Sequence, residues 1–366
     1  MWRTLVCLVL MTPAVLAEAR FIEHAIADGL TGGYQVIIAD MNHDGKPDLI
    51  ALASGLQELS WYENPGWQKH VIVSGIKQPI NAAVVRVGDD GVPVLALAHE
   101  FSPNAAKSAG VVSILEHKGD TWIRTDIDRL PTSHRLRMLN GWLINAPLTN
   151  AEAKPPDYRG AIPLVAYQPG DWKRKLVSDA DEGVLHCIYP VDWDGKGREA
   201  LLTASFQGIH LIRSSKDGSF ERTKLTSGSP APWPKSGASD VAVGVLGKVR
   251  FLASIEPWHG NEVAVYTEGK GAWARDVIDS SLVDGHTLVV ADLDGNGRSV
   301  ILAGYRGKGA SVNLYRFDGK AWVKSVLDNG GMAGAGCAVG DLNGDGRLDV
   351  ACIGTSTANL KWYENR

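Results

Sequence analysis

Cysteine is scarce in this chain, with 4 cysteines in 366 residues. That scarcity excludes a scaffold built from disulfides, so the fold must rely on a packed core. Cys7 lies in an N-terminal segment that we expect to be removed, which leaves Cys187, Cys337 and Cys352, and an odd number cannot pair completely. Cys337 and Cys352 flank one predicted hairpin turn. A bond between them is one interpretation, and two buried thiols is the one we favour.

Long apolar runs are missing beyond the N-terminus. Residues 1–19 have the features of a secretory signal: Arg3, an apolar core over Leu5–Leu16, and small residues at Ala17 and Ala19. This apolar core is too short to span a membrane, and no second candidate follows. We therefore expect an exported protein, periplasmic or extracellular, with no membrane span.

A strong charge of either sign is also absent. The formal net charge is -4 and 21% of the residues are charged, which is ordinary for a globular protein. Nothing here indicates a nucleic-acid or anionic-membrane partner, and no obligate protein partner is evident. The chain also lacks a nucleophile elbow, a P-loop, a dinucleotide fingerprint and an HExxH motif, which argues against those enzyme classes.

A short pattern recurs along the chain at intervals of 46 to 55 residues. It consists of an aromatic residue, usually a basic residue two places later, and apolar residues at about the fifth and sixth places. The seven copies are Phe21–Ile26, Trp67–Ile72, Trp122–Ile127, Trp172–Val177, Phe220–Leu225, Trp273–Ile278 and Trp322–Leu327. Three further apolar strands precede most copies. This period and strand count predict an all-β fold, a seven-bladed β-propeller of four-stranded blades.

The two ends of the chain complement one another. The last repeat stops at Leu360–Arg366, one strand short, and the first pattern has no strands before it. We expect the N-terminal strand to complete the last blade and close the ring. Residues 20–366 are therefore predicted to form a single propeller domain.

Four turns between the first and second strands of a blade are acidic and rich in glycine. Two of them carry oxygen side chains at loop places 1, 3, 5 and 9, as a hard cation requires. These are Asp40, Asn42, Asp44 and Asp48, and Asp341, Asn343, Asp345 and Asp349. The other two turns, Asp192–Glu199 and Asp292–Ser299, are incomplete. We predict structural calcium in the two complete loops; the alternative is that Asp and Gly only cap a tight turn.

Three histidines occupy one place in three repeats: His134, His186 and His286 each lie six residues before a turn position. A shared offset gives a shared direction in a strand, so three imidazoles should converge at the channel mouth opposite the acidic turns. Three neutral imidazoles with an open fourth position describe a catalytic zinc site. The alternatives are a metal-free cluster or histidines with no role.

Further polar residues map to the same mouth. We assign proton transfer to four of them: His99, Glu100, Glu256 and His259. Five are predicted to contact a sugar substrate: Tyr34, Gln207, Trp258, Tyr305 and Arg306. Two insertions, Phe101–Gly110 and Leu148–Gly160, should overhang this face.

The acidic repeats resemble the FG-GAP/VCBS repeats of integrin-like propellers, which implies the fold and not the function. Five segments narrow the resemblance: 61–72, 133–137, 256–260, 284–288 and 359–365. These look like the propeller domain of aldos-2-ulose dehydratases, which also act on 1,5-anhydrofructose. The resemblance implies zinc in the propeller cleft, where dehydration occurs. The family's cupin domains, which carry a later isomerisation, have no counterpart in these 366 residues, so only the first elimination is implied.

Three functions therefore follow as hypotheses. The first is a zinc-dependent lyase acting by β-elimination on a keto-sugar, such as 1,5-anhydrofructose, an aldosulose or a 3-keto-glycoside. The second is a calcium-stabilised propeller that binds glycans or mediates adhesion without catalysis. The third is a polysaccharide lyase that uses His and Tyr on a uronate, with calcium as a cofactor.

Overall fold

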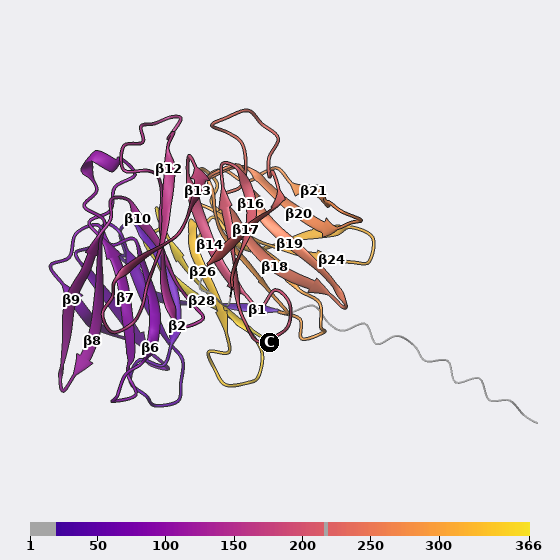
Figure 1. The fold of residues 1–366 in the computed structure, drawn as a ribbon. Coiled ribbons are helices and arrows are strands. Elements are labelled where there is room, and N and C mark those ends of the chain that lie inside the picture. Colours follow the sequence, from indigo (N-terminus) through magenta and orange to yellow (C-terminus); the bar gives the residue numbers. More distant parts are fainter. Residues whose placement is uncertain (1–19, 216–218) are drawn as a thin grey trace, which may run out of the picture.

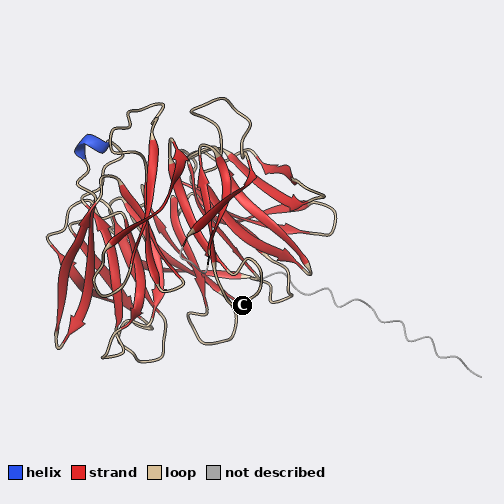
Figure 2. Cartoon of the chain, in the orientation of Figure 1, coloured by secondary structure: helices blue, strands red, loops and turns tan. Residues whose placement is uncertain are grey.

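The computed structural model describes residues 20–215 and 219–366. The predicted signal, residues 1–19, lies outside the described residues. The regular secondary structure of the described chain is β-strand, apart from one short 3₁₀ helix, η1 (Ala105–Lys107) (Figures 1 and 2). No helix in the described part is long and apolar enough to cross a membrane.

The strands form seven antiparallel sheets of four. Blades 1 to 3 consist of β2 (Gly33–Ala39), β3 (Asp48–Ala53), β4 (Glu58–Glu63) and β5 (Gln68–Ser74); β6 (Asn81–Val87), β7 (Pro93–His99), β8 (Val111–Lys118) and β9 (Thr121–Arg129); and β10 (Ser133–Leu139), β11 (Trp142–Pro147), β12 (Ala161–Tyr167) and β13 (Arg174–Glu182). Blades 4 and 5 consist of β14 (Leu185–Val191), β15 (Ala200–Ser205), β16 (Gly208–Ser214) and β17 (Phe220–Thr226); and β18 (Asp240–Leu246), β19 (Val249–Glu256), β20 (Glu262–Glu268) and β21 (Trp273–Asp279). Blades 6 and 7 consist of β22 (Gly285–Ala291), β23 (Val300–Tyr305), β24 (Ser311–Phe317) and β25 (Trp322–Asn329); and β26 (Gly334–Gly340), β27 (Asp349–Gly354), β28 (Leu360–Asn365) and β1 (Phe21–Ala27).

The ring closes as predicted. The N-terminal strand β1 is the outermost strand of blade 7 and pairs with β28, with Phe21 opposite Asn365. The innermost strands contact one another in sequence around the ring, and β26 of blade 7 contacts β2 of blade 1. The seven-bladed propeller is therefore confirmed, with the first and last described strands paired in one blade.

Tyrosine hydroxyls tie neighbouring blades together. Tyr167 donates to Asp128 at 2.5 Å, Tyr315 to Asp279 at 2.6 Å and Tyr363 to Asp328 at 2.8 Å. Each tyrosine lies on the third strand of one blade and each aspartate on the fourth strand of the preceding blade. These aspartates come six residues after the aromatic residue of the repeat. The repeat therefore encodes the packing between blades as well as the strand pattern.

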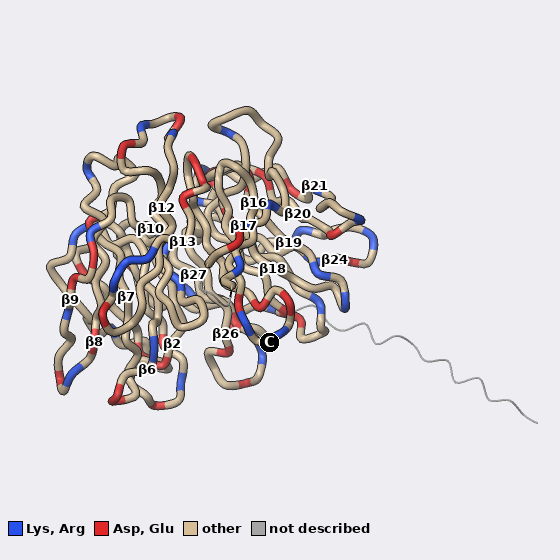
Figure 3. Tube along the Cα trace, in the orientation of Figure 1, with Lys and Arg blue, Asp and Glu red and all other residues tan. Residues whose placement is uncertain are grey.

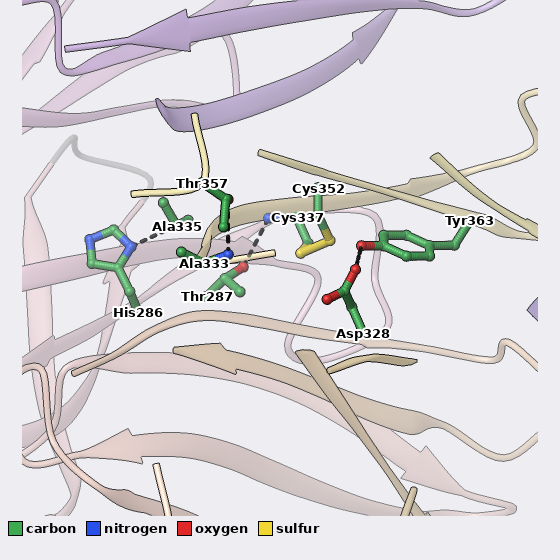
Figure 4. Close-up of a disulfide and its surroundings, with 9 residues drawn as sticks. All are labelled: His286, Thr287, Asp328, Ala333, Ala335, Cys337, Cys352, Thr357 and Tyr363. Atoms are coloured by element: carbon green, nitrogen blue, oxygen red, sulfur yellow. Dashed lines mark hydrogen bonds between the residues drawn. A yellow bond between two sulfur atoms is a disulfide. The ribbon is translucent and has the colours of Figure 1, made fainter. Parts of the chain in front are cut away.

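The interpretation of Cys337 and Cys352 as two thiols is wrong. They form a disulfide across β26 and β27, where they are direct register partners (Figure 4). The sequence placed them on either side of a hairpin, but only the register brings them opposite one another. Cys187 is a buried free thiol.

Acidic and basic segments are interspersed along the chain trace (Figure 3). Positive and negative side chains therefore balance one another locally as well as over the whole sequence. Arg316 and Asp294, for example, form an ion pair at 2.9 Å.

Candidate metal centre

The three histidines of equal offset lie at equivalent places in the fold. Each is the second residue of an innermost strand: His134 in β10, His186 in β14 and His286 in β22. In each case the pairing with the second strand shifts by one residue around the histidine, which is a β-bulge. A bulge leaves one residue without a ladder partner and redirects its side chain.

The same bulge occurs in blades 1 and 7, at Tyr34 and Ala335. Blades 2 and 5 lack it there, because Asn81 and Asp240, the first residues of their innermost strands, begin a regular ladder. Five blades therefore present a bulge residue at the start of the innermost strand. Tyr34 lies close to His134 and His286, with ring centroids 6.1 and 4.9 Å apart.

Three imidazoles meet at this end of the ring. The ligand atoms of His186, His259 and His286 all lie within 4.8 Å of one another. His186 Nε2 and His259 Nε2 are 3.3 Å apart. Two nitrogen ligands of a tetrahedral zinc ion with bonds of about 2.0–2.1 Å are separated by about 3.3 Å. The donor set and this spacing suit zinc.

The Nδ1 atoms of His186 and His286 face hydrogen-bond acceptors, whereas His259 Nδ1 lies between a carboxylate and the Arg306 guanidinium. His186 Nδ1–H donates to Ser239 O at 3.1 Å, and His286 Nδ1–H donates to Ala335 O at 2.5 Å (Figure 4). His259 Nδ1 lies 3.3 Å from Asp284 Oδ1. Donation through Nδ1 leaves the lone pair on Nε2, and such acceptors commonly orient metal-binding histidines. His286 Nε2 is buried without any partner, as a ligand nitrogen awaiting its metal would be.

Burial and neighbouring cations keep these rings neutral. Burial lowers the pKa of His186 and His286 well below the usual value, and Arg135 and Arg306 lower both pKa values further. Burial lowers the pKa of His259 to about 3, with Arg306 adding to the effect. Neutral imidazole is the form that binds a metal.

His134 differs from the other two bulge histidines. Its Nε2 is 2.7 Å from Tyr34 Oη, and its Nδ1 has no partner. Its ring lies 5.1 Å from that of His186. Arg135, the next residue, donates through Nη1 to Tyr34 Oη at 3.1 Å and through Nε to the His186 carbonyl at 3.0 Å. His134 therefore belongs to a Tyr–His–Arg group beside the three converging imidazoles.

The more open side of the centre is formed by blades 5 and 6. The side chains of His259 and Arg306 are 28% and 16% exposed, whereas His186 and His286 are almost fully buried. Arg306 donates to both oxygens of Asp284, and its Nη2 lies 3.1 Å from His259 Nδ1. The Trp258 ring lies 4.7 Å from that of His259. A ligand would reach the imidazoles from this side.

Two predicted proton-transfer residues, His99 and Glu256, make their hydrogen bonds within their own blades. His99 Nε2 contacts Ser113 within blade 2 at 2.8 Å. Glu256 is fully buried and accepts from Tyr266 and from Arg275, the bond from Tyr266 being 2.6 Å long. Glu256 thus accepts the Tyr266 hydroxyl bond, as aspartates of the preceding blade do for the tyrosines at equivalent places in other blades.

Three other predicted residues lie at the periphery. Glu100 lies 3.9 Å from Arg129, and Gln207 accepts from Arg222 at 3.2 Å. Tyr305 donates to Gly309 O at 2.6 Å. The hydrogen bonds and ion pairs of these three go to other residues, whereas Tyr34, Trp258 and Arg306 of the predicted substrate-binding set adjoin the imidazoles.

The predicted overhang is present. The loop carrying η1 and the loop before β12 rise above the strands (Figure 1). The Phe101 ring lies 5.2 Å from His134, and the Tyr158 ring lies 5.6 Å from Trp258. Both insertions thus reach the histidine face.

The acidic turns lie at the other end of the innermost strands. Asp48 and Asp349 are buried, and each accepts two backbone N–H groups: Met41 and Asn64 for Asp48, Leu342 and Asn365 for Asp349. Among the residues that the structure describes, these turns hold no three carboxylates with ligand atoms within 4.8 Å of one another.

The first aspartate of each turn binds backbone as well. Asp40 and Asp341 accept N–H groups of their own loops. Asp192 and Asp292, in the two incomplete turns, accept equivalent N–H groups. The complete and incomplete turns thus share one hydrogen-bonding scheme.

Sequence reasoning missed Arg135, Ser239 and Asp284, and it placed His259 among proton-transfer groups. Two of these had a local signal, because Arg135 directly follows His134 and Asp284 precedes His286 by two residues. Ser239 had none, since it contributes a backbone carbonyl from the neighbouring blade.

Comparison with known proteins is consistent with this architecture. Residues 109–269 match the family described as "Aldos-2-ulose dehydratase, beta-propeller domain". The chain is 28% identical over 240 residues to "Aldos-2-ulose dehydratase" of Phanerodontia chrysosporium. That match covers 54% of this chain and 26% of the relative, so the chain spans about a quarter of the relative's length.

Solved structures share the fold at low identity. Kuenenia stuttgartiensis hydrazine synthase has a TM-score of 0.59 at 12% identity, covering 91% of this chain and 96% of that one. The extracellular domain of a protein assigned to a hybrid two component system of Bacteroides thetaiotaomicron has a TM-score of 0.57 at 11% identity, covering 94% of this chain and 39% of that one. These likenesses establish the propeller alone. The expected resemblance is confirmed: this chain is a seven-bladed β-propeller similar to the propeller domain of aldos-2-ulose dehydratase.

Proposed function

We propose that this protein is a zinc-dependent lyase that performs β-elimination on a keto-sugar. The candidate substrates are 1,5-anhydrofructose, an aldosulose and a 3-keto-glycoside. The observation that carries the proposal is the convergence of His186, His259 and His286, with a carbonyl acceptor at Nδ1 of His186 and of His286. The likeness to a sugar dehydratase supports the reaction class.

His186, His259 and His286 would hold the zinc ion, so His259 takes the place that the offset argument gave to His134. A zinc ion bound there would act as a Lewis acid on the keto oxygen and so acidify the neighbouring C–H. Because Nδ1–H of His186 and of His286 is fixed on a carbonyl of the adjacent blade, both ligands are oriented before the metal binds.

Tyr34 is the proposed base. Arg135 Nη1–H donates to Tyr34 Oη, and the neutral His134 can donate its Nε2–H to the same oxygen. In its phenolate form, Tyr34 Oη would accept the proton from the carbon next to the carbonyl. The C–O bond at the following carbon then breaks, and Tyr34 Oη–H returns the proton to the departing oxygen. Water leaves from a hydroxyl, and an alcohol leaves from a glycoside.

Arg306 and Trp258 are proposed to position the sugar. Arg306 holds Asp284 and approaches His259, so it can orient both groups at the exposed side. The partly exposed indole of Trp258 offers an apolar face beside His259. Tyr305 would contribute only at the periphery, because its hydroxyl already donates to Gly309 O.

We further propose that the protein is exported and acts on a small molecule without nucleic-acid or obligate protein partners. The Cys337–Cys352 disulfide supports export, because such bonds persist in oxidising compartments. The signal-like residues 1–19 add to this argument.

The decisive experiment is metal analysis of the purified protein together with an assay on keto-sugars. We expect about one zinc per chain and the growth of enone absorbance on incubation with substrate. Zinc absent from protein prepared in zinc-containing medium would overturn the proposal. Glycan binding without metal or turnover would instead favour the binding propeller, and activity confined to polymers would favour a polysaccharide lyase.

A further inference from the structure

A second polar groove lies beside blade 4, apart from the imidazole centre. Phe206 and Trp233 form its apolar wall, and Gln207, His210, Arg222 and Lys224 supply much of its polar surface. Serine side chains from the segment that connects blades 4 and 5 complete the lining. We infer that this groove is a binding site for a sugar unit that carries a carboxylate. The inference is independent of the proposed elimination.

Buried polar atoms around this groove lack partners. His210 is 2% exposed and lines the groove, and its Nδ1 has no hydrogen-bond partner. Arg222 Nε, which belongs to another lining residue, is also buried and unpartnered. Oγ1 of Thr203, the register partner of His210, and one oxygen of Asp181 also lack partners, although neither residue lines the groove. Folded proteins pair nearly all such atoms, so a cluster of exceptions at a groove points to a polar ligand.

The charge of the lining selects an anion. Arg222 Nη2 donates to Asp181 Oδ1 at 2.8 Å and to Gln207 Oε1 at 3.2 Å, which leaves Nε unused. Lys224 is exposed, and within the described residues it takes part in no ion pair. Asp181 does not line the groove, and its Oδ1 already accepts from Ser205 and Arg222. A carboxylate on the ligand would therefore meet Lys224 at the rim.

The aromatic wall is held in place before any ligand arrives. Trp233 Nε1 donates to Asp157 O at 2.9 Å, and the Arg159 guanidinium stacks 3.8 Å from the indole centroid. The Phe206 ring meets Trp233 edge-on, with centroids 5.1 Å apart. A wall fixed from both sides loses little conformational entropy on binding. An aromatic wall with a few placed polar groups is typical of a site for a small polar molecule.

The groove and the imidazole centre share a boundary but no lining residue. The Phe206 ring lies 5.9 Å from Trp258, which in turn adjoins His259. None of the three imidazoles lines the groove. Binding in the groove can thus be measured whether or not the centre holds zinc or turns over a substrate.

The test is calorimetric titration of the full exported chain with methyl β-glucuronide and, as the neutral match, methyl β-glucoside. We expect the glucuronide to bind more tightly. Lys224→Gln should weaken glucuronide binding about fivefold and leave glucoside binding unchanged, because one exposed ion pair is lost. Lys224→Arg should restore the preference, and Trp233→Ala should weaken both ligands about tenfold or more.

Two controls separate this site from the centre. Lys270→Gln, an exposed lysine on blade 5, should leave both affinities unchanged. The double variant His186→Ala/His286→Ala should retain glucuronide binding. The inference is overturned if the glucuronide shows no preference over the glucoside, if Lys224→Gln binds like wild type, or if binding disappears with the two histidines.

Discussion

The two ends of the innermost strands carry polar side chains that are used in different ways. At the start of the strands, His286 Nε2 and His134 Nδ1 are buried without partners. At the far end, both oxygens of Asp48 and both of Asp349 accept backbone N–H groups. Buried polar atoms without partners are rare, so those beside the converging imidazoles are consistent with a ligand site, whereas the fully paired aspartates have a structural role. The comparison predicts that mutations at the two ends will damage different properties.

The largest effect is expected at the histidine end. The double variant His186→Ala/His286→Ala should lose bound zinc and reduce kcat/KM on a keto-sugar by at least about a hundredfold, because the Lewis acid is lost. Metal analysis and enone absorbance measure the two effects. His117→Ala is the matched control and should change neither, because this partly exposed histidine on the outer strand pair of blade 2 contacts Asp90. Full zinc content in the double variant would contradict the assignment.

Tyr34→Phe tests the proton-transfer group beside the metal ligands. The variant keeps the ring but removes the oxygen that faces His134 and Arg135. We expect kcat to fall by roughly 10²–10⁴ with zinc content unchanged. Measuring kcat and KM separately is essential, because a residue that only packs against His286 would leave kcat near wild type.

Stability should suffer most at the acidic-turn end. Asp48→Ala leaves two buried N–H groups unpaired and should lower the free energy of unfolding by about 2–6 kcal/mol, at about 1–3 kcal/mol for each group. Asp44→Ala, on the exposed part of the same turn, should cost less than about 1 kcal/mol. Urea unfolding measures both variants, and zinc content should not change in either. Loss of zinc from Asp48→Ala in folded protein would break the distinction between the two ends.

The metal-free protein should lose stability as the pH falls. Burial lowers the folded pKa of His259 to about 3, below the ordinary value of about 6.5 that applies to the unfolded chain. Between these values the unfolded state binds the extra proton, so stability decreases from about pH 6.5 downward. The Tm of zinc-stripped protein, followed from pH 7 to pH 4.5, should fall less steeply in His259→Gln than in wild type. Equal slopes would show that His259 is not held neutral.

Calcium should have the smallest effect. The two complete loops offer Asp40, Asn42 and Asp44, and Asp341, Asn343 and Asp345, in addition to the capping aspartates. If these loops bind calcium as predicted, millimolar calcium should raise the Tm by a few degrees, because a ligand of the folded state stabilises it. Asp44→Ala/Asp345→Ala should abolish this shift. No shift in wild type would leave the turns as backbone caps only.

The histidine site shows which features of a site a repeat pattern can predict and which it cannot. The shared offset of His134, His186 and His286 predicted that they lie at one mouth, and the structure places all three at the second residue of an innermost strand. The strand pattern did not reveal the bulge that redirects them. A bulge depends on the pairing of two strands, and a single strand's alternation carries no record of it.

Other assignments failed to follow from position alone. Glu256 ends β19 and His259 lies three residues later in the following loop. The Glu256 carboxylate accepts from Tyr266 and Arg275, whereas His259 contacts the other imidazoles. Period 2 separates the two faces of a strand, but past the end of β19 the loop geometry sets the direction of each side chain. The Cys337–Cys352 bond was missed for a similar reason, because only the register of β26 and β27 shows that the two cysteines lie opposite one another.

By itself, the sequence determined the number of blades, the closure of the ring and the common location of the bulge histidines. These are properties of a repeat: identical units must stack in identical ways, and equal offsets must reach equal places. Only the tertiary structure decided that His259 joins His186 and His286 while His134 pairs with Tyr34. That choice depends on distances between blades and on carbonyls such as Ser239 O and Ala335 O, which come from neighbouring repeats and leave no mark in the histidine's own strand.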